Sequence, residues 1–327
     1  MNNNNKDVSV LITGGCGMVG SHLAEYYYNL GNTTTATYHT HPTINLEEVK
    51  DKAHYVPCDI RNAAQVLEII EQCMPDIIYH LAAQSYPTVS WEKPVETMDT
   101  NVNGTINVFE AVKKIRIAKP TYDPIVVIAC SSAEYGASLT PENVPISEQT
   151  ELLPLHPYGV SKVGQDLLGF QYYTNNKIRN IRARIFNTTG PRKETDVASD
   201  FTKRAVMFER GQVSSLKVGN LSTKRALTDV RDLVNALVLL AEHGAAGDVY
   251  NICGERVYEI SSIVKLIEEI MGISLPLEVD PALIRLSDEP VIFGSSEKLK
   301  SCTNWEQKID LKTTLSDMIN YWKQALV

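Results

Sequence analysis

Three glycines spaced three residues apart, Gly14, Gly17 and Gly20, lie between the first apolar run of the chain (8–13) and its first amphipathic stretch (19–30). Between a strand and a helix, such glycines allow a tight turn and a close approach of the backbone to a pyrophosphate. The free N–H groups at the start of the helix also favour an anion. The pattern predicts the first unit of a dinucleotide-binding domain, with a cofactor site that includes Gly14, Gly17, Met18, Val19 and Gly20.

Short apolar runs alternate with amphipathic stretches through the first half of the chain. We expect further strands at 33–38, 55–57, 77–81, 125–131, 216–218 and 249–252, and helices at 63–72, 102–115, 230–242 and 260–271. The βαβ alternation predicts a parallel sheet covered by helices on both faces, with ligands at the carboxyl ends of its strands.

After about residue 184 the strands shorten, the loops lengthen and basic residues cluster. We therefore predict an α/β fold with two parts. A Rossmann doubly wound parallel sheet occupies 1–184. A smaller, mostly helical substrate-binding region occupies 185–327 and shares some elements with the first part.

Composition excludes several classes of protein. The net charge of -8 argues against nucleic acid or an anionic membrane as a partner, although a local arginine cluster can still hold an anionic small molecule. No apolar stretch reaches the roughly 20 residues that span a bilayer, and the start of the chain lacks a signal-peptide pattern. The six cysteines are scattered without a CxxC pair, which indicates reduced thiols in a cytoplasmic protein and no metal site.

The end of the second expected strand bears on the choice of cofactor. An acid there favours NAD and a base favours NADP, but residues 37–41 contain neither Asp nor Arg. The missing acid favours NADP(H) over NAD(H) by a small margin, with His39 or His41 facing the 2′-phosphate; alternatively both are solvent-exposed loop histidines. Asp59, after the third strand, is placed to accept a bond from the adenine amino group.

A tyrosine and a lysine four residues apart, Tyr158 and Lys162, fall on one face of a helix. An ammonium beside a phenol lowers the phenol pKa and makes it a usable acid or base. Ser131 ends an apolar strand one βα unit upstream, where its hydroxyl can hydrogen-bond a reacting carbonyl or alcohol. The three residues together predict carbonyl–alcohol redox chemistry; the alternative is an ordinary surface helix and a capping serine.

These motifs resemble those of the extended short-chain dehydrogenases/reductases that act on nucleotide sugars. The resemblance runs almost end to end and is closest to the branch that contains GDP-mannose 4,6-dehydratase and GDP-4-keto-6-deoxymannose reductase. The segments that carry it are TGGCGMVG (13–20), HLAA (80–83), NVNGT (101–105), SSAEYG (131–136), YGVSK (158–162), RIFN (184–187), GPR (190–192), KVGN (217–220) and RLSDEP (285–290).

The resemblance implies a nicotinamide cofactor, a nucleotide-sugar substrate with GDP favoured, and a catalytic triad of Ser131, Tyr158 and Lys162, with Ser132 and Glu134 beside it. It adds to the cofactor site Ile60, Leu81, Ala82, Ala83 and Asn101. For the substrate it implies Ser85, Asn187, Arg192, Lys203, Val218, Asn220, Arg225, Arg285 and Asp288. Guanidinium groups suit a diphosphate. The family also implies a homodimer through helices near 102–115 and 158–173, with a tetramer as the alternative.

The reaction itself has several readings. The dehydratases carry an acid, usually Glu, two positions after the triad Ser or Thr, where this chain has Ala133; in an extended segment Glu134, one residue later, would face the other way. Reduction of the C4 ketone of a GDP-4-keto-6-deoxyhexose is therefore the leading hypothesis. A C4 dehydrogenase or epimerase with tightly bound NAD(H), a dehydratase that uses Glu134, and a non-catalytic nucleotide sensor are the alternatives.

Overall fold

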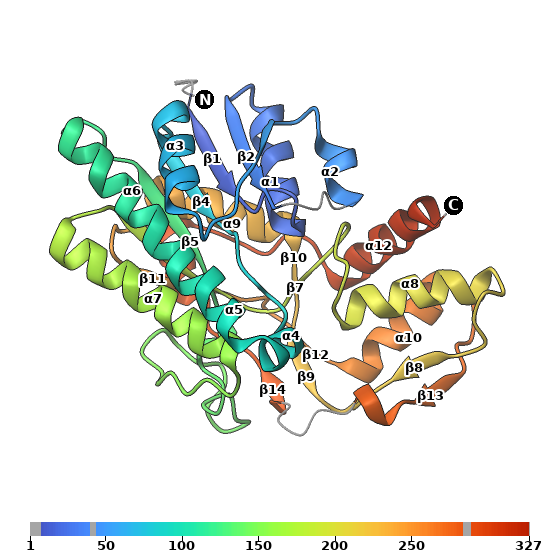
Figure 1. The fold of residues 1–327 in the computed structure, drawn as a ribbon. Coiled ribbons are helices and arrows are strands. Elements are labelled where there is room, and N and C mark those ends of the chain that lie inside the picture. Colours follow the sequence, from blue (N-terminus) through green and yellow to red (C-terminus); the bar gives the residue numbers. More distant parts are fainter. Residues whose placement is uncertain (1–7, 40–43, 284–288, 327) are drawn as a thin grey trace.

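A computed structural model describes residues 8–39, 44–283 and 289–326 (Figure 1). Its centre is a seven-stranded sheet in the order β11-β6-β5-β4-β1-β2-β3, in which every neighbouring pair is parallel. The strands are β1 (Val10–Thr13), β2 (Thr34–Tyr38), β3 (His54–Pro57), β4 (Ile77–His80), β5 (Ile125–Ser131), β6 (Asn180–Ile185) and β11 (Val249–Ile252). The strand order reverses between β1 and β4, so a ligand crevice is expected at the carboxyl ends of these two strands.

Helices cover both faces of the sheet (Figure 1). In and around the sheet they are α1 (Met18–Asn29), α2 (Ile44–Val49), α3 (Ala63–Cys73), α4 (Pro87–Glu92), α5 (Pro94–Met98), the π-helical segment η1 (Asp99–Asn103), α6 (Gly104–Ala118), the short 3-10 turn η2 (Ser132–Glu134), α7 (Pro157–Asn176), α9 (Val230–His243) and α11 (Glu297–Thr303). On one face α1 and α9 bury Leu23 and Leu237 against the strands. On the other face α3, α6 and α7 form a second core, in which the rings of Phe109 and Tyr172 stack at 4.5 Å.

The rest of the chain forms a smaller region that stands beside the sheet (Figure 1). It contains α8 (Val197–Glu209), α10 (Ile260–Met271), the 3-10 turn η3 (Pro281–Leu283), α12 (Leu311–Ala325) and the short strands β7 (Thr188–Thr189), β8 (Leu216–Val218), β9 (Lys224–Ala226), β10 (Thr228–Asp229), β12 (Val257–Glu259), β13 (Leu277–Val279) and β14 (Val291–Ile292). Its core packs α8, α10 and α12 together around Phe201, Ile263 and Leu315. Because β11 and α9 come from the second half of the chain but complete the sheet and its cover, the two parts share elements.

The predicted α/β fold with a parallel Rossmann sheet is confirmed. One expected helix, 102–115, differs: the helical path starts with π-helical η1 at Asp99, and α6 begins at Gly104. Gly104 packs against Ile60, a tertiary contact that the local sequence does not reveal. Within the described ranges, no helix combines the length and apolar character that crossing a membrane requires.

Candidate active site

The glycine loop joins β1 to α1 at the reversal point of the sheet. Gly14 has φ +72°, and a Cβ there would lie 2.9 Å from the amide nitrogen of Ala82, so only glycine fits this turn. The exposed Gly17 precedes the first turn of α1 and offers no side chain to cap its N–H groups. Uncapped N–H groups at a bare helix N-terminus fit a pyrophosphate, so the loop has the shape that a dinucleotide cofactor requires. Met18, Val19 and Gly20 form that first turn.

The segment after β4 forms the other wall of this loop. The amide nitrogens of Leu81 and Ala82 donate to the hydroxyl of Thr13, both at 3.1 Å, which fixes them beside Gly14. Ala83 follows in the same half-buried segment. The predicted cofactor residues of the two strands therefore meet at one edge of the sheet.

The amide of Asn101 does not face this crevice. The side chain is fully buried: its nitrogen donates to the Ser161 hydroxyl at 2.8 Å and to the carbonyl of Gln84 at 3.0 Å, and its oxygen accepts from the Gln84 amide. In this structure these bonds use the polar atoms of Asn101, and its role as a cofactor contact stays a prediction. Asn101 instead ties α7 to the segment after β4.

Three side chains, His39, Asp59 and Arg61, lie together at the ends of β2 and β3. Arg61 makes a two-pronged ion pair with Asp59, with Nε–Oδ1 3.0 Å and Nη2–Oδ2 2.8 Å, and this guanidinium holds the pKa of Asp59 down at about 2. His39 Nε2 lies 3.7 Å from the same carboxylate. Ile60, between the two charged residues, is buried against Gly104. Sequence reasoning missed Arg61, although its place two residues after Asp59 at a strand end was a usable signal.

The predicted triad converges where β5 ends and α7 begins. Tyr158 lies in the first turn of α7, near enough to Ser131 for the serine side chain to lower the pKa of the phenol. Lys162, one turn further along, is buried; its Nζ donates to the carbonyl of Ala129 at 2.8 Å and lies 5.6 Å from the centre of the Tyr158 ring. His156 caps this helix by accepting from the amide of Gly159 at 3.0 Å.

Burial moves both titrating groups of the triad toward their neutral forms. It raises the pKa of Tyr158 to about 12, against a smaller opposing effect of the Ser131 hydrogen bond. Burial also lowers the pKa of Lys162 to about 8, and electrostatic interactions with Cys130 and Glu134 partly oppose this decrease. A phenol that loses its proton here would leave a phenolate beside the Lys162 ammonium, which stabilises it.

A buried ion cluster lies directly behind the triad. The Nε of Arg184, on β6, is 2.9 Å from Asp166 Oδ2 and 3.2 Å from Glu134 Oε2. Arg182, two residues earlier on the same strand, pairs with the other oxygen of Asp166 at 2.7 Å. Cys130 adds its sulfur to this group, but the arginines are the positive partners of both carboxylates. Sequence reasoning missed this cluster.

Glu134 belongs to that cluster and not to the open site. The segment that follows Ser131 is a 3-10 turn, so the expectation of an extended segment is wrong. The Glu134 side chain has no exposed surface and its Oε1 accepts from the Ser131 amide at 2.8 Å. In this structure the carboxylate faces the Ser131 amide and Arg184, and a direct catalytic contact by Glu134 stays an untested prediction. Ser132, the first residue of the turn, is also buried.

The predicted substrate residues are scattered over the edge of the sheet and the smaller region. Asn187, just after β6, has a buried Oδ1 without a hydrogen-bond partner among the described residues. Arg225 on β9 is buried and its Nη1 donates to the carbonyls of Lys224 and Glu289. Val218 is buried on β8, Asn220 follows it at the surface, and Ser85 is exposed before α4. Arg285 and Asp288 lie outside the described residues.

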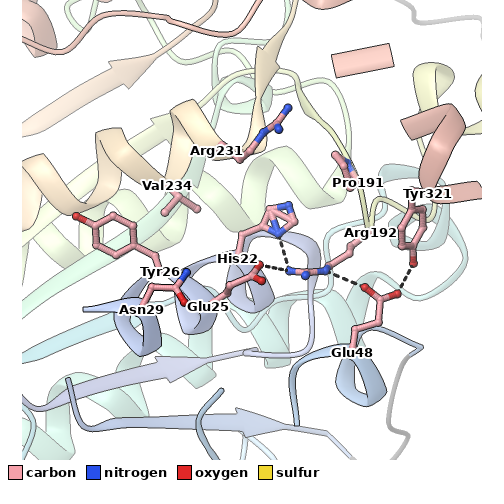
Figure 2. A pocket seen from close by; sticks show the side chains of 10 residues that line it. All are labelled: His22, Glu25, Tyr26, Asn29, Glu48, Pro191, Arg192, Arg231, Val234 and Tyr321. Carbon is pink, nitrogen blue, oxygen red and sulfur yellow. Dashed lines mark hydrogen bonds and ion pairs between the residues drawn. The ribbon is translucent and has the colours of Figure 1, made fainter. Parts of the chain in front are cut away.

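Arg192 and Lys203 are engaged elsewhere. Figure 2 shows Arg192 in a cavity of about 380 Å³ bounded by α1, α2, α9 and α12. Its guanidinium binds Glu25 at 3.1 Å, Glu48 at 3.0 Å and His22 at 2.8 Å, and the Lys203 ammonium lies 5.0 Å above the ring of Trp322. The predicted diphosphate role of Arg192 is thus not supported, because carboxylates from α1 and α2 already neutralise it.

Comparison with known proteins decides the family. Residues 11–318 match the family model described as GDP-mannose 4,6 dehydratase. The chain belongs to this family. It is accordingly an NAD(P)-dependent enzyme of the extended short-chain dehydrogenase/reductase class.

Two relatives show the range of activities around this family member. GDP-6-deoxy-D-mannose reductase of Pseudomonas aeruginosa is 30% identical over 255 residues, 77% of this chain and 82% of the relative. GDP-mannose 4,6-dehydratase of Vibrio cholerae is 26% identical, over 96% of this chain and 93% of the relative.

Solved structures place the same family fold over nearly the whole chain. The RMD protein of Pseudomonas aeruginosa complexed with NADPH superposes with a TM-score of 0.81 at 26% identity, over 97% of this chain and 99% of that one. A UDP-glucose 4-epimerase of Thermotoga maritima with UDP-glucose gives a TM-score of 0.86 at 24% identity, over 98% and 100%, which supports the fold alone.

Proposed function

We propose that this enzyme reduces the C4 ketone of a GDP-linked 4-keto-6-deoxyhexose to an alcohol. The observation that carries the proposal is the complete Ser131–Tyr158–Lys162 triad beside a position, Ala133, that lacks the acid of the dehydratases, while the neighbouring Glu134 is sealed in the protein. The likeness to a GDP-6-deoxy-D-mannose reductase points the same way.

The triad has the parts that ketone reduction needs. When bound on the glycine loop, the nicotinamide cofactor supplies a hydride to the carbonyl carbon. Tyr158 donates its phenolic proton to the carbonyl oxygen as the C=O bond becomes C–OH. Ser131 hydrogen-bonds that oxygen, and the Lys162 ammonium stabilises the phenolate that remains.

Dehydration requires an additional acid/base side chain beyond the Ser131–Tyr158–Lys162 triad. Loss of the C5 proton and of the C6 hydroxyl takes an additional acid/base side chain within hydrogen-bond reach of the sugar. Glu134 is the carboxylate nearest in sequence, but its oxygens face the Ser131 amide and Arg184. This arrangement favours reduction over elimination.

For the cofactor we propose a preference for NADP(H). No acid stands at the end of β2, and the basic side chain of His39 lies there, where an adenosine 2′-phosphate would bind; Arg61, at the end of β3, is already paired with Asp59. For the nucleotide we propose GDP, with the guanidinium of Arg225 and the Oδ1 of Asn187, which has no hydrogen-bond partner among the described residues, among its partners.

For the assembly we propose a homodimer through α6 and α7. The outer face of α7 exposes three large apolar side chains at helical spacing, Val160, Leu167 and Phe170, and α6 exposes Ile117. An apolar face of this kind on a small protein is typical of a subunit contact.

The test follows nicotinamide absorbance when the purified enzyme meets GDP-4-keto-6-deoxymannose, with NADPH and NADH in parallel. We expect oxidation of the reduced cofactor, faster with NADPH. Tyr158→Phe is the matched variant: it should lose turnover by roughly 10²-fold or more and still bind the cofactor. The proposal would be refuted if the enzyme left both NADPH and NADH unoxidised. The enzyme would then be tested for the alternatives, dehydration of GDP-mannose to a 4-keto-6-deoxy product and epimerisation of a GDP-sugar.

A further inference from the structure

We propose that Glu134 is a positioning residue for the catalytic serine: its carboxylate holds the turn after β5 so that the Ser131 hydroxyl meets Tyr158. The inference rests on the proposed reductase function, because it assigns a role within that same triad. It gives Glu134, whose side chain has no exposed surface, a role that needs no direct contact with the substrate.

The contacts form a short chain from the carboxylate to the phenol. Glu134 Oε1 accepts from the Ser131 amide at 2.8 Å, and Ser131 Oγ accepts from the Ala133 amide at 3.1 Å. These two bonds close the 3-10 turn as a capping box. The bond from the Ala133 amide fixes the position of the serine hydroxyl, which is near enough to Tyr158 to lower the pKa of the phenol.

The far oxygen of Glu134 is held from behind. Oε2 lies 3.2 Å from Arg184 Nε, and Arg184 also binds Asp166 at 2.9 Å. Arg184 Nη1 donates to the hydroxyl of Tyr135 at 2.9 Å. The Glu134 carboxylate is therefore bound on one side by the Ser131 amide and on the other by the Arg184 guanidinium. These two contacts restrict its rotation toward the substrate.

Glu134 also acts on the triad through its charge. The charged and titratable groups packed around it are Arg184 from β6, Asp166 and Lys162 from α7, Cys130 from β5, and the neighbouring Tyr135 and Tyr158. Its negative charge raises the pKa of both Tyr158 and Lys162. Its own pKa is raised to about 8, first by burial and then by Asp166. Above about pH 8, where Glu134 is ionised, neutralising this position should therefore shift the titration of the triad to lower pH.

The experiment compares Glu134→Ala and Glu134→Gln with the wild type and with a control, Asp232→Asn. Asp232 is likewise a buried carboxylate that accepts backbone amides, those of Lys308 and Ile309, but on α9 away from the triad. We expect Glu134→Ala to lower kcat by up to roughly 10²-fold with the KM for the ketosugar and for NADPH within about twofold. Glu134→Gln, whose amide oxygen can still accept from Ser131, should recover most of kcat.

The pH dependence separates positioning from mere stability. In Glu134→Gln the alkaline limb of the kcat profile should move to lower pH, and NMR titration of isotope-labelled tyrosine, with Tyr158→Phe to assign the signal, should show a lowered pKa for Tyr158. Asp232→Asn should move neither, even where it melts earlier. Equal losses of kcat in Glu134→Ala and Glu134→Gln, or an unshifted Tyr158 titration, would overturn the inference.

The titration needs no substrate, so the two proposals fail separately. A wild-type enzyme that leaves the ketosugar unreduced sinks the proposed function, while the Tyr158 signal still decides the role of Glu134. If Glu134→Ala does not fold, Glu134→Gln decides the matter by its titration alone.

Discussion

Replacing Arg184 with methionine should be among the most damaging single changes in this protein. The guanidinium is buried, and it is the shared partner of two carboxylates, Glu134 and Asp166, that have no exposed surface. It also donates to the Tyr135 hydroxyl at 2.9 Å and to the carbonyl of Glu148 at 3.1 Å. Methionine fills most of the volume but satisfies none of these groups.

The size of the effect follows from what is left behind. Removing one partner of a buried ion pair costs about 3–5 kcal/mol of unfolding free energy, because the other charge is left uncompensated. Against a total stability of roughly 5–15 kcal/mol, that is a large fraction.

The loss should also depend on pH, with a defined sign. Burial raises the pKa of Glu134 to about 8, so the folded state binds this proton more tightly than the unfolded chain, and stability falls as pH rises toward that value. Arg184 opposes the rise, so its removal lifts the pKa of Glu134 further and prolongs the fall. The difference between Arg184→Met and the wild type should therefore grow above about pH 8, and be smaller at about pH 6, where Glu134 is protonated in both.

Urea unfolding followed by circular dichroism at about pH 6 and pH 9 measures both effects. Arg204→Met is the matched control: Arg204 makes an exposed ion pair with Asp200 within α8, and its loss should cost less than about 1 kcal/mol. Adding Glu134→Gln and Asp166→Asn to Arg184→Met should remove the pH dependence. A loss below about 1 kcal/mol for Arg184→Met, or one that is equal at both pH values, would refute this account of the cluster.

Three further outcomes are expected. The kcat/KM of the wild type should fall as pH rises through about 8, because the Lys162 ammonium that stabilises phenolate loses its proton there; a limb that persists in Lys162→Met would contradict this. Arg192→Ala should lower the free energy of unfolding by roughly 1–3 kcal/mol and leave GDP affinity by calorimetry unchanged, since its partners are Glu25 and Glu48; lost GDP binding at unchanged stability would restore the substrate role. Leu167→Glu should give a monomer in sedimentation, and a dimer that survives it would place the subunit contact elsewhere.

Much of the fold could be predicted because buried parallel strands appear as continuous apolar runs. The strand at 125–131 and the helix at 260–271 have the predicted bounds, since their limits coincide with changes in local hydrophobic pattern. The start of α6 could not be predicted in the same way. Its Gly104 is set by a contact with Ile60, more than forty residues earlier, and such a contact has no local signature.

The site was predictable where one helix and one strand end supply it. Tyr158 and Lys162 share a helix face, and Ser131 ends a strand that packs beneath it. The partners of Arg192 were not predictable, since Glu25 and Glu48 lie far away in the sequence.

The segment around Glu134 is different, because a local sequence pattern does predict its conformation. The segment after Ser131 was expected to be extended, whereas its pattern is that of a capped turn. Residues 131–134 spell Ser-x-x-Glu, the pattern of a capping box, and the structure forms that box. Likewise, Arg182 and Arg184 lie on one face of β6, two residues apart, and Asp166 stands one helical turn after Lys162. Burying an unpaired charge is energetically costly, so buried charged residues at such spacings are expected to form ion pairs with one another. Taken together, these patterns predict an ion cluster under the triad. The position of Glu134 in the sequence suggested a role in elimination chemistry. Its position in the fold instead places its carboxylate against the Ser131 amide, where it supports the serine of the proposed reductase.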